Sequence, residues 1–258
     1  MKDVAYLDLS TNRRIAYHTL PAKGDCASLP GLIFLGGFNS AMSGIKATWL
    51  QGWAETRGRA FLRFDYTGHG LSSGRFDEGC IGDWLDDAVS VLDRLSSGPQ
   101  IVIGSSMGGW IALLMALRRP QRVAGFIGLA AAPDFTEDGI RASLTPAQRV
   151  EMARSGQITV PSQYSEAPYT LTRHLMEEGR NHLVLRNPLI LNCPVRLLHG
   201  TADPDVDMHV ALRLLNHLDG PDTRLTLLKD ADHRLSDDRA LGIIARLIDE
   251  ITETITAT

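Results

Sequence analysis

The stretch that decides the fold is Gln100-Ile-Val-Ile-Gly-Ser-Ser-Met-Gly-Gly-Trp-Ile-Ala-Leu-Leu-Met-Ala-Leu117. It begins with the short apolar run Ile101–Ile103, which is typical of a buried strand. It ends with Trp110–Leu117, a run rich in Ala, Leu and Met that favours a helix. Between the two runs, Gly104-Ser-Ser-Met-Gly108 fits the pattern G-x-S-x-G. The stretch therefore predicts a strand, a tight turn that carries a serine, and a helix.

Ser106 is the candidate nucleophile on this turn. Gly104 and Gly108 flank it and lack a Cβ, so the strand and the helix can approach each other closely. The Ser106 hydroxyl then projects from the turn, and the backbone amide of Met107 can point at an oxyanion. Ser105 does not fit, because neither residue two positions away from it is glycine. The motif alone leaves one alternative, a glycine-rich turn with an incidental serine.

A serine hydroxyl is a weak nucleophile, so it needs a base, and the base needs an acid that orients it. After a serine on such a turn, the chain order is an acid and then a histidine. Leu197-Leu-His-Gly-Thr-Ala-Asp203 places Asp203 just past one apolar run. Leu227-Leu-Lys-Asp-Ala-Asp-His233 places His233 just past the next. If these strands are parallel to the first, Ser106, Asp203 and His233 meet at one edge of the sheet.

Other acids and histidines compete for these roles. Asp205 and Asp207 remain alternatives to Asp203, although they lie further from the strand end. Asp230 and Asp232 are expected to shape the turn before His233. Packed, structural or surface positions are expected for the other histidines: His199 at its strand end, His69 in a glycine turn with Asp65, His174 and His182 on a solvated face, and His18, His209 and His217.

A second oxyanion donor is expected in the loop that follows the apolar run Leu32–Leu35. Gly36 and Gly37 allow the backbone to approach a substrate there, so the Phe38 amide is predicted to act beside the Met107 amide. Losing one such donor typically lowers turnover by about 10²–10³. A plain glycine turn is the alternative interpretation.

Strands and helices alternate along the chain, which predicts a mostly parallel sheet with helices on both faces. Strands are expected at 4–9, 13–20, 32–35, 60–64, 101–103, 123–129, 195–198 and 225–228, and helices at 44–57, 81–96, 110–117, 207–218 and 238–254. From about Asp134 to Pro188 no buried-strand run appears. We therefore predict a single domain over 1–258 with a helical cap inserted at about 134–188.

Composition and charge exclude several classes of function. The net charge is −4 and like charges form no block, so neither nucleic acid nor an anionic membrane is an expected partner. The three cysteines, Cys26, Cys80 and Cys193, suggest no disulfide framework and suit a reducing compartment. No set of His, Cys and Asp residues has metal-ligand spacing, and we expect no metal and no cofactor.

The start of the chain bears on location. Met-Lys-Asp-Val-Ala-Tyr-Leu-Asp-Leu-Ser10 contains no apolar signal region and no Arg- and Ser-rich transit character. No apolar run approaches the roughly 18–20 residues that a membrane span needs. The sequence therefore predicts a cytoplasmic protein.

Five motifs together resemble the α/β-hydrolases over nearly the whole chain: Leu-Gly-Gly at 35–37, Arg63-Phe-Asp-Tyr-Thr-Gly-His-Gly70, Gly-x-Ser-x-Gly at 104–108, His199-Gly-x-x-Asp203 and Asp232-His233. Within that superfamily, four segments look like the palmitoyl-protein thioesterase branch, which also cleaves acyl-glucuronides: Gly104–Trp110, Val160–Glu166, Asn192–Gly200 and Asp232–Arg234. The absence of a mitochondrial targeting segment makes the chain look like a bacterial relative. The resemblance implies a serine thioesterase or esterase with Ser106, Asp203 and His233 as its triad.

The hypothesis that follows is a serine hydrolase that cleaves acyl esters or thioesters, on a small molecule or an acylated protein, through an acyl-enzyme and without a cofactor. C–C bond hydrolases and lactonases use the same triad, so they remain alternatives. A non-catalytic receptor that uses the hydrolase pocket is an alternative of a different class.

Overall fold

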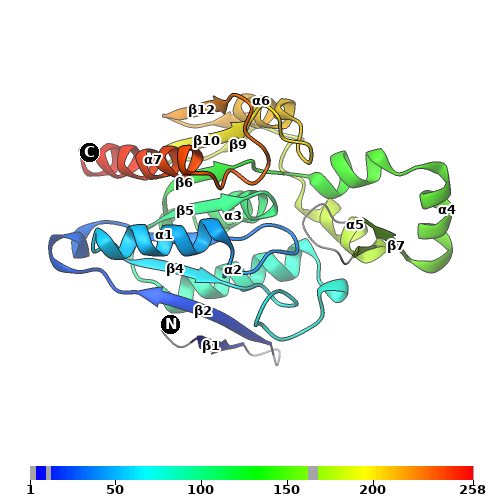
Figure 1. Cartoon of the computed structure of the whole chain (residues 1–258), viewed down its shortest axis with the longest axis horizontal. Helices are drawn as coiled ribbons and strands as arrows, with labels where there is room; N and C mark the ends of the chain where they lie inside the picture. The colour runs from blue at the N-terminus through cyan, green and yellow to red at the C-terminus, as the bar shows by residue number, and fades with distance from the viewer. Residues whose placement is uncertain (1–3, 10–12, 162–167, 258) are drawn as a thin grey trace.

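An eight-stranded sheet forms the centre of the computed structural model, which describes residues 4–9, 13–161 and 168–257 (Figure 1). The strands are β1 (Ala5–Asp8), β2 (Arg14–Leu20), β3 (Gly31–Leu35), β4 (Phe61–Phe64), β5 (Gln100–Ser105), β6 (Val123–Leu129), β10 (Val195–Gly200) and β12 (Thr223–Leu228). Their order across the sheet is β1-β2-β4-β3-β5-β6-β10-β12. β2 pairs antiparallel with both β1 and β4, and every pairing from β4 to β12 is parallel.

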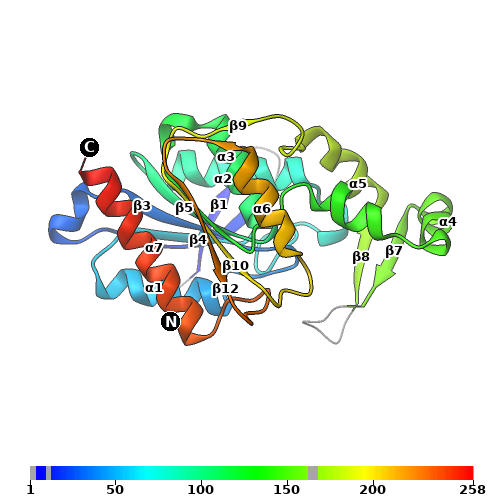
Figure 2. The ribbon, with the colours of Figure 1, turned by 90° about the horizontal axis from the view of Figure 1, so that it is seen from above.

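Helices cover both faces of this sheet, as predicted. The helices are α1 (Ile45–Thr56), α2 (Ile81–Leu95), α3 (Met107–Arg118), α6 (Met208–His217) and α7 (Asp238–Thr256). Figure 2 shows α1 and α7 on one side of the sheet and α2, α3 and α6 on the other. In the described part of the chain, no helix combines the length and the apolar character that crossing a membrane requires.

The two faces carry two separate apolar cores because successive strand residues point to opposite sides of a sheet. In β5, Ile101 and Ile103 pack with α1 and α7, whereas Val102 packs with α2 and α3. Every residue of β5 is buried, as are all five residues of β3. Such continuous apolar runs are what a parallel strand covered on both faces needs, and they explain why the sequence predicted these strands well.

The segment predicted as a cap extends beyond the sheet (Figure 1). It holds the π-helix η4 (Phe135–Arg141), α4 (Pro146–Ser155), α5 (Arg173–Gly179) and the short turn η5 (Arg180–His182). It also holds an antiparallel pair of strands that the sequence analysis did not predict, β7 (Gln157–Val160) and β8 (Tyr169–Thr172). Only Ile158 and Leu171 are buried in this pair, so the pair shows no apolar run. Residues 10–12, which connect the first two predicted strands, and residues 162–166 of the segment Val160–Glu166 lie outside the described residues.

Asp134 joins the two ends of this segment. Its side chain is fully buried, and its two oxygens accept hydrogen bonds from the backbone amides of Val184 (2.8 Å) and Leu185 (2.9 Å). Burial raises the pKa of Asp134 despite these two amides and the nearby Arg186, whose Nη1 lies 3.2 Å away. The Asp134 carboxylate therefore joins the first residue of the inserted segment to residues near its last.

We expect Asp134→Ala to lower the free energy of unfolding by about 2–6 kcal/mol, since each of the two buried amides that loses its acceptor costs about 1–3 kcal/mol. Urea unfolding followed by circular dichroism measures this loss. Asp138→Ala is the matched control, because Asp138 pairs with Arg186 and Arg213 at the surface, where a pair contributes about 0–1 kcal/mol. Equal losses in the two variants would contradict the role given to Asp134.

Candidate active site

Ser106 stands on the turn between β5 and α3, with φ 54° and ψ −120°. A positive φ is rare for a residue with a side chain and costs about 1–3 kcal/mol, so the surrounding structure must hold it in place. The Ser106 amide donates to the Leu129 carbonyl (2.9 Å), and the Ser106 carbonyl accepts from the amides of Gly109 (2.8 Å) and Ala132 (3.1 Å). These bonds fix the strained turn against the end of β6.

The glycines of the motif are required by close backbone contacts. A Cβ on Gly104 would collide with the carbonyl group of Gly108, and a Cβ on Gly108 would collide with the carbonyl of Leu35 in β3. Ser105 is buried at the end of β5, whereas Ser106 is partly exposed. Of the two serines, only Ser106 is therefore partly open to solvent, and its role as nucleophile stays a prediction.

The predicted acid and base are hydrogen-bonded to each other. His233 Nδ1 lies 2.8 Å from Asp203 Oδ2, and Asp203 Oδ1 accepts from the backbone amides of Asp205 and Val206, both at 2.9 Å. Because Nδ1 faces a carboxylate, it carries the proton, and Nε2 is left to accept one. Of the two alternative acids, Asp205 is exposed and Asp207 caps α6 through the His209 amide.

Asp203 is a buried carboxylate that stays charged. Burial raises its pKa, but hydrogen bonds from His199, His233 and the Val206 amide outweigh burial, so the pKa lies well below its usual range. His199 Nε2 lies 2.8 Å from the Val206 carbonyl and 3.3 Å from Asp203 Oδ2. The sequence alone predicts only a packed or hydrogen-bonded histidine at this strand end. The i, i+4 spacing of His199 and Asp203 at a strand end was the signal for this partnership.

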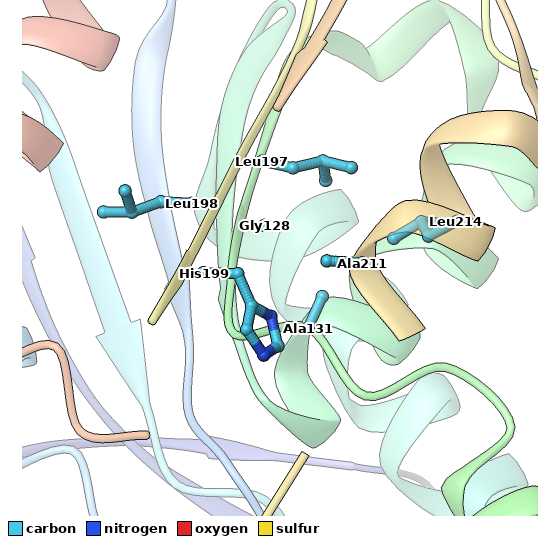
Figure 3. Close-up of a pocket in the computed structure, with 7 residues that line it drawn as sticks. All are labelled: Gly128, Ala131, Leu197, Leu198, His199, Ala211 and Leu214. Carbon is cyan, nitrogen blue, oxygen red and sulfur yellow. The ribbon is translucent and has the colours of Figure 1, made fainter. Parts of the chain in front are cut away.

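Figure 3 shows the His199 side chain at the end of β10. Its ring lies beside Ala131, where apolar side chains that include Leu197 and Leu214 fill the space between the sheet and α6. Within the described residues, His199 Nδ1 has no hydrogen-bond partner, so only Nε2 makes polar contacts. Both acceptors of Nε2 belong to the loop that carries Asp203, and His199 therefore positions that loop.

The turn before His233 is shaped by Asp232, as predicted. Asp232 Oδ1 accepts from the amides of Arg234 (3.0 Å) and Leu235 (3.3 Å). Lys46 from α1 also donates to the Arg234 carbonyl. Hydrogen bonds from within the loop, to Asp232, and from Lys46 of α1 therefore both hold the loop that carries His233.

Parallel pairing brings the three candidate residues to the same edge of the sheet. Ser105 is in register with Leu129 in β6, Leu129 with Leu198 in β10, and Gly200 with Leu228 in β12. The bond between His233 and Asp203 is formed, whereas no hydrogen bond joins the Ser106 hydroxyl to His233 in the part of the chain that the structure describes. Catalytic hydrogen bonds of this kind are often long in free enzymes and tighten when substrate binds.

Two backbone amides, those of Phe38 and Met107, are the predicted oxyanion donors. Met107 is the first residue of α3, so its amide has no acceptor within the helix. A Cβ on Gly37 would lie 3.3 Å from the Ser106 Cβ, which puts the loop after β3 directly against the turn. Neither the Phe38 amide nor the Met107 amide donates to another group of the described chain. Both amides therefore remain available, as the predicted role requires.

The Phe38 side chain packs among aromatic rings from two parts of the protein. The centroid of the Phe38 ring lies 4.8 Å from that of Phe76, 5.9 Å from that of Trp84, 5.6 Å from that of Phe135 and 5.7 Å from that of Tyr169. All four pairs are edge to face. Phe135 and Tyr169 belong to the inserted segment. An apolar wall built from the core and the insertion therefore adjoins the candidate oxyanion site.

His69 supports the same loop, which the sequence analysis did not foresee. Its Nε2 accepts a hydrogen bond from the Asn39 amide (3.3 Å), and Nδ1 faces the Thr67 carbonyl (3.3 Å). Asp65, in the same glycine turn, accepts from the amides of Met42 (2.5 Å) and Leu71 (2.8 Å). The turn that was expected to be structural thus holds the part of the loop that follows Phe38, at Asn39 and at Met42.

Burial lowers the pKa of His69 to about 4, although its hydrogen bond to Thr67 acts in the opposite direction. The unfolded chain binds the proton near pH 6.5, so its protonation favours unfolding. The contribution of neutral His69 is complete above about pH 6.5 and is lost as the pH falls towards about 4. From pH 7 to pH 5, we expect wild type to lose about 2 kcal/mol more stability than His69→Gln.

Urea unfolding of both proteins at the two pH values measures this difference. Other titrating groups are common to the two proteins and cancel in the comparison. Parallel losses of stability in wild type and in His69→Gln would show that His69 does not titrate as its burial requires.

Comparisons with known proteins agree with this architecture. The model of the family described as serine aminopeptidase, S33, matches residues 32–189. The chain belongs to this family of α/β hydrolases. It is 35% identical to the mitochondrial palmitoyl-protein thioesterase ABHD10 of Mus musculus over 253 residues, which cover 98% of this chain and 83% of the mouse protein.

Solved structures of α/β hydrolases superpose closely on this chain. A putative hydrolase from Agrobacterium vitis S4 is 39% identical, with a TM-score of 0.92, 97% of this chain covered and 98% of that one. Alpha/beta hydrolase domain-containing protein 10 from mouse is 34% identical, with a TM-score of 0.89, 98% of this chain covered and 99% of that one. The predicted fold is therefore confirmed, and the chain is a hydrolase homologous to a thioesterase.

Proposed function

We propose that this hydrolase cleaves acyl thioesters and esters through Ser106, His233 and Asp203. The observation that carries the proposal is the hydrogen-bonded pair of His233 and Asp203 at the sheet edge where the strained Ser106 turn also ends. A nucleophile on a tight turn, a base oriented by a buried charged acid, and two available amides are the parts that acyl transfer needs. The homology to a palmitoyl-protein thioesterase supports the thioester as substrate.

In the proposed reaction, Ser106 Oγ attacks the acyl carbonyl carbon while His233 Nε2 takes the hydroxyl proton. The Phe38 and Met107 amides donate to the oxyanion, and Asp203 stabilises the charged imidazole. The imidazole then gives its proton to the departing thiol or alcohol, which leaves an acyl-enzyme. Water, deprotonated by His233, attacks that ester and releases the acid and free Ser106. No cofactor enters any step.

The apolar wall around Phe38 supports an acyl group as the part of the substrate that this hydrolase holds. We propose as substrate an acyl ester or thioester, carried either by a small molecule or by an acylated protein. A panel of acyl thioesters and p-nitrophenyl esters from short to long chain, together with an aryl acyl-glucuronide, tests the reaction class. We expect turnover of thioesters or esters, and the chain length preferred reports the space beside Phe38.

A fluorophosphonate probe tests the nucleophile independently of the substrate. An activated Ser106 should react with it covalently, and mass spectrometry of the digested protein should locate the adduct on the peptide that contains Ser106. Absence of both turnover and labelling would favour a receptor that uses the hydrolase pocket. Labelling without turnover on the panel would favour a C–C bond hydrolase or a lactonase.

A further inference from the structure

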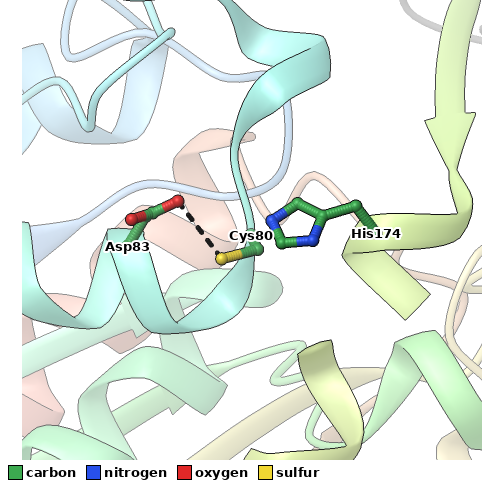
Figure 4. Close-up of side chains that lie close together, drawn as sticks. All are labelled: Cys80, Asp83 and His174. Carbon is green, nitrogen blue, oxygen red and sulfur yellow. Dashed lines mark hydrogen bonds between the residues drawn. The ribbon is translucent and has the colours of Figure 1, made fainter. Parts of the chain in front are cut away.

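A group of metal-binding side chains lies where the inserted segment meets the core, outside the candidate active site. Cys80 is the N-cap residue of α2, Asp83 lies in the first turn of that helix, and His174 belongs to α5. One ligand atom from each of the three lies within 4.8 Å of the other two. Figure 4 shows the His174 ring beside Cys80, whose thiol points at Asp83 over 3.2 Å. The sequence spacing hid this group because His174 lies far along the chain from the other two.

A further carboxylate faces the same place. Glu178 is one turn beyond His174 on α5, so both side chains project from the same face of that helix. Its Oε2 accepts from the Gly82 amide (3.0 Å), and its Oε1 lies 2.5 Å from His182 Nε2. Glu178 is thus held in place by α2 and η5, close to Cys80.

The charge at this place favours a cation. Cys80 is buried, and the carboxylates of Asp83 and Glu178 both lie near its thiol. The Nη1 of Arg13 lies 3.5 Å from Asp83 but also 3.3 Å from Asp87, so Asp83 and Asp87 share its positive charge. A divalent cation would neutralise the carboxylates and replace the thiol proton, which is the usual effect of a metal on a cysteine.

We propose that Cys80, Asp83 and His174 bind a thiophilic divalent cation of the zinc type and that the ion links α2 of the core to α5 of the insertion. Thiolate, imidazole and carboxylate are the ligands that zinc prefers, at about 2.0–2.3 Å. Tetrahedral ligands at that range lie roughly 3.3–3.8 Å apart, which small side-chain rotations reach from the present positions. On binding, the Cys80 thiol releases its proton to solvent and its sulfur bonds to the metal, with no change of oxidation state.

An ion could reach these three ligands from solvent, and a further carboxylate lies beside them. His174 is exposed, so the site opens to solvent and leaves a fourth ligand position for water. Glu178 stays bonded to the Gly82 amide and supplies a nearby negative charge, as outer partners of metal sites do. The inference is independent of the proposed function, because none of these residues belongs to the proposed catalytic set.

Cobalt binding provides the sharpest test. Metal-free protein under a non-thiol reductant is titrated with Co²⁺, and the near-ultraviolet charge-transfer band of a thiolate bound to cobalt is recorded. We expect one equivalent to bind with this band, and Zn²⁺ to displace the cobalt. Cys80→Ser should abolish the band, and His174→Ala should weaken binding at least about 100-fold, more than the 10–100-fold typical of losing an outer partner.

Two comparisons keep this test decisive. His174 is exposed, so His174→Ala should fold normally even if the buried Cys80→Ser variant does not, and circular dichroism of both checks this. Asp203, Asp205 and His233 form another group with metal-ligand geometry. Zinc binding that disappears in His233→Ala but persists in His174→Ala would overturn the proposal, as would a cobalt complex without a thiolate band.

Discussion

Replacing Ser106 by alanine is expected to lower kcat for an acyl thioester by about 10⁴–10⁶-fold, the range seen when a triad nucleophile is removed. The variant loses the only atom that the proposed reaction places for attack, while the oxyanion amides and the apolar wall remain. KM should change little, because the hydroxyl acts in the transition state and not in ground-state binding. Steady-state turnover with the best thioester of the panel measures the effect.

The same motif offers a matched control for this prediction. Ser105→Ala removes a hydroxyl of the same kind one residue earlier, at a buried position at the end of β5. We expect it to retain turnover within about tenfold of wild type, since a small buried substitution shifts the turn little. The proposed mechanism fails if Ser105→Ala is the inactive variant, or if Ser106→Ala keeps its activity.

The local parts of this protein could be predicted from the sequence. The turn at Ser106 could be predicted because its glycines are required by contacts within a few residues and with β3, the neighbouring strand. The strands β3 and β5 could be predicted because burial on both faces demands unbroken apolar runs. The meeting of Asp203 and His233 followed from one topological rule, that the carboxyl ends of parallel strands share an edge.

The parts that depend on tertiary contact could not be predicted in the same way. The strands β7 and β8 each bury a single residue, and their pairing is decided by the core beneath them. His69 supports the Phe38 loop through a backbone amide 30 residues away, which no local pattern reveals. Cys80 and His174 come together only because α5 packs against α2. Such features can be found only in the folded chain, because the residues are close in space but far apart in the sequence.

Asp203→Asn should lower kcat by about 10⁴-fold, because an amide cannot hold His233 in the tautomer that leaves Nε2 free to accept the serine proton. Its charge is lost as well, so the imidazolium that forms during attack is no longer stabilised. Both effects concern the transition state, and KM should therefore stay close to that of wild type. Steady-state turnover with the thioester used for Ser106→Ala measures the loss on the same scale.

Asp205→Asn is the comparison that separates position from charge. It removes an equal charge two residues away, from a side chain that is exposed. The backbone amide of residue 205 still donates to Asp203 Oδ1 (2.9 Å). Because Asp203 keeps its bonds to His199 and His233, we expect Asp205→Asn to lose less than about tenfold in kcat, below the 10–100-fold range typical of losing an outer partner. If Asp205→Asn loses as much as Asp203→Asn, charge near the imidazole matters more than the hydrogen bond. If Asp203→Asn stays active while Asp205→Asn or Asp207→Asn does not, the acid has been misassigned and the loop after β10 must rearrange when substrate binds.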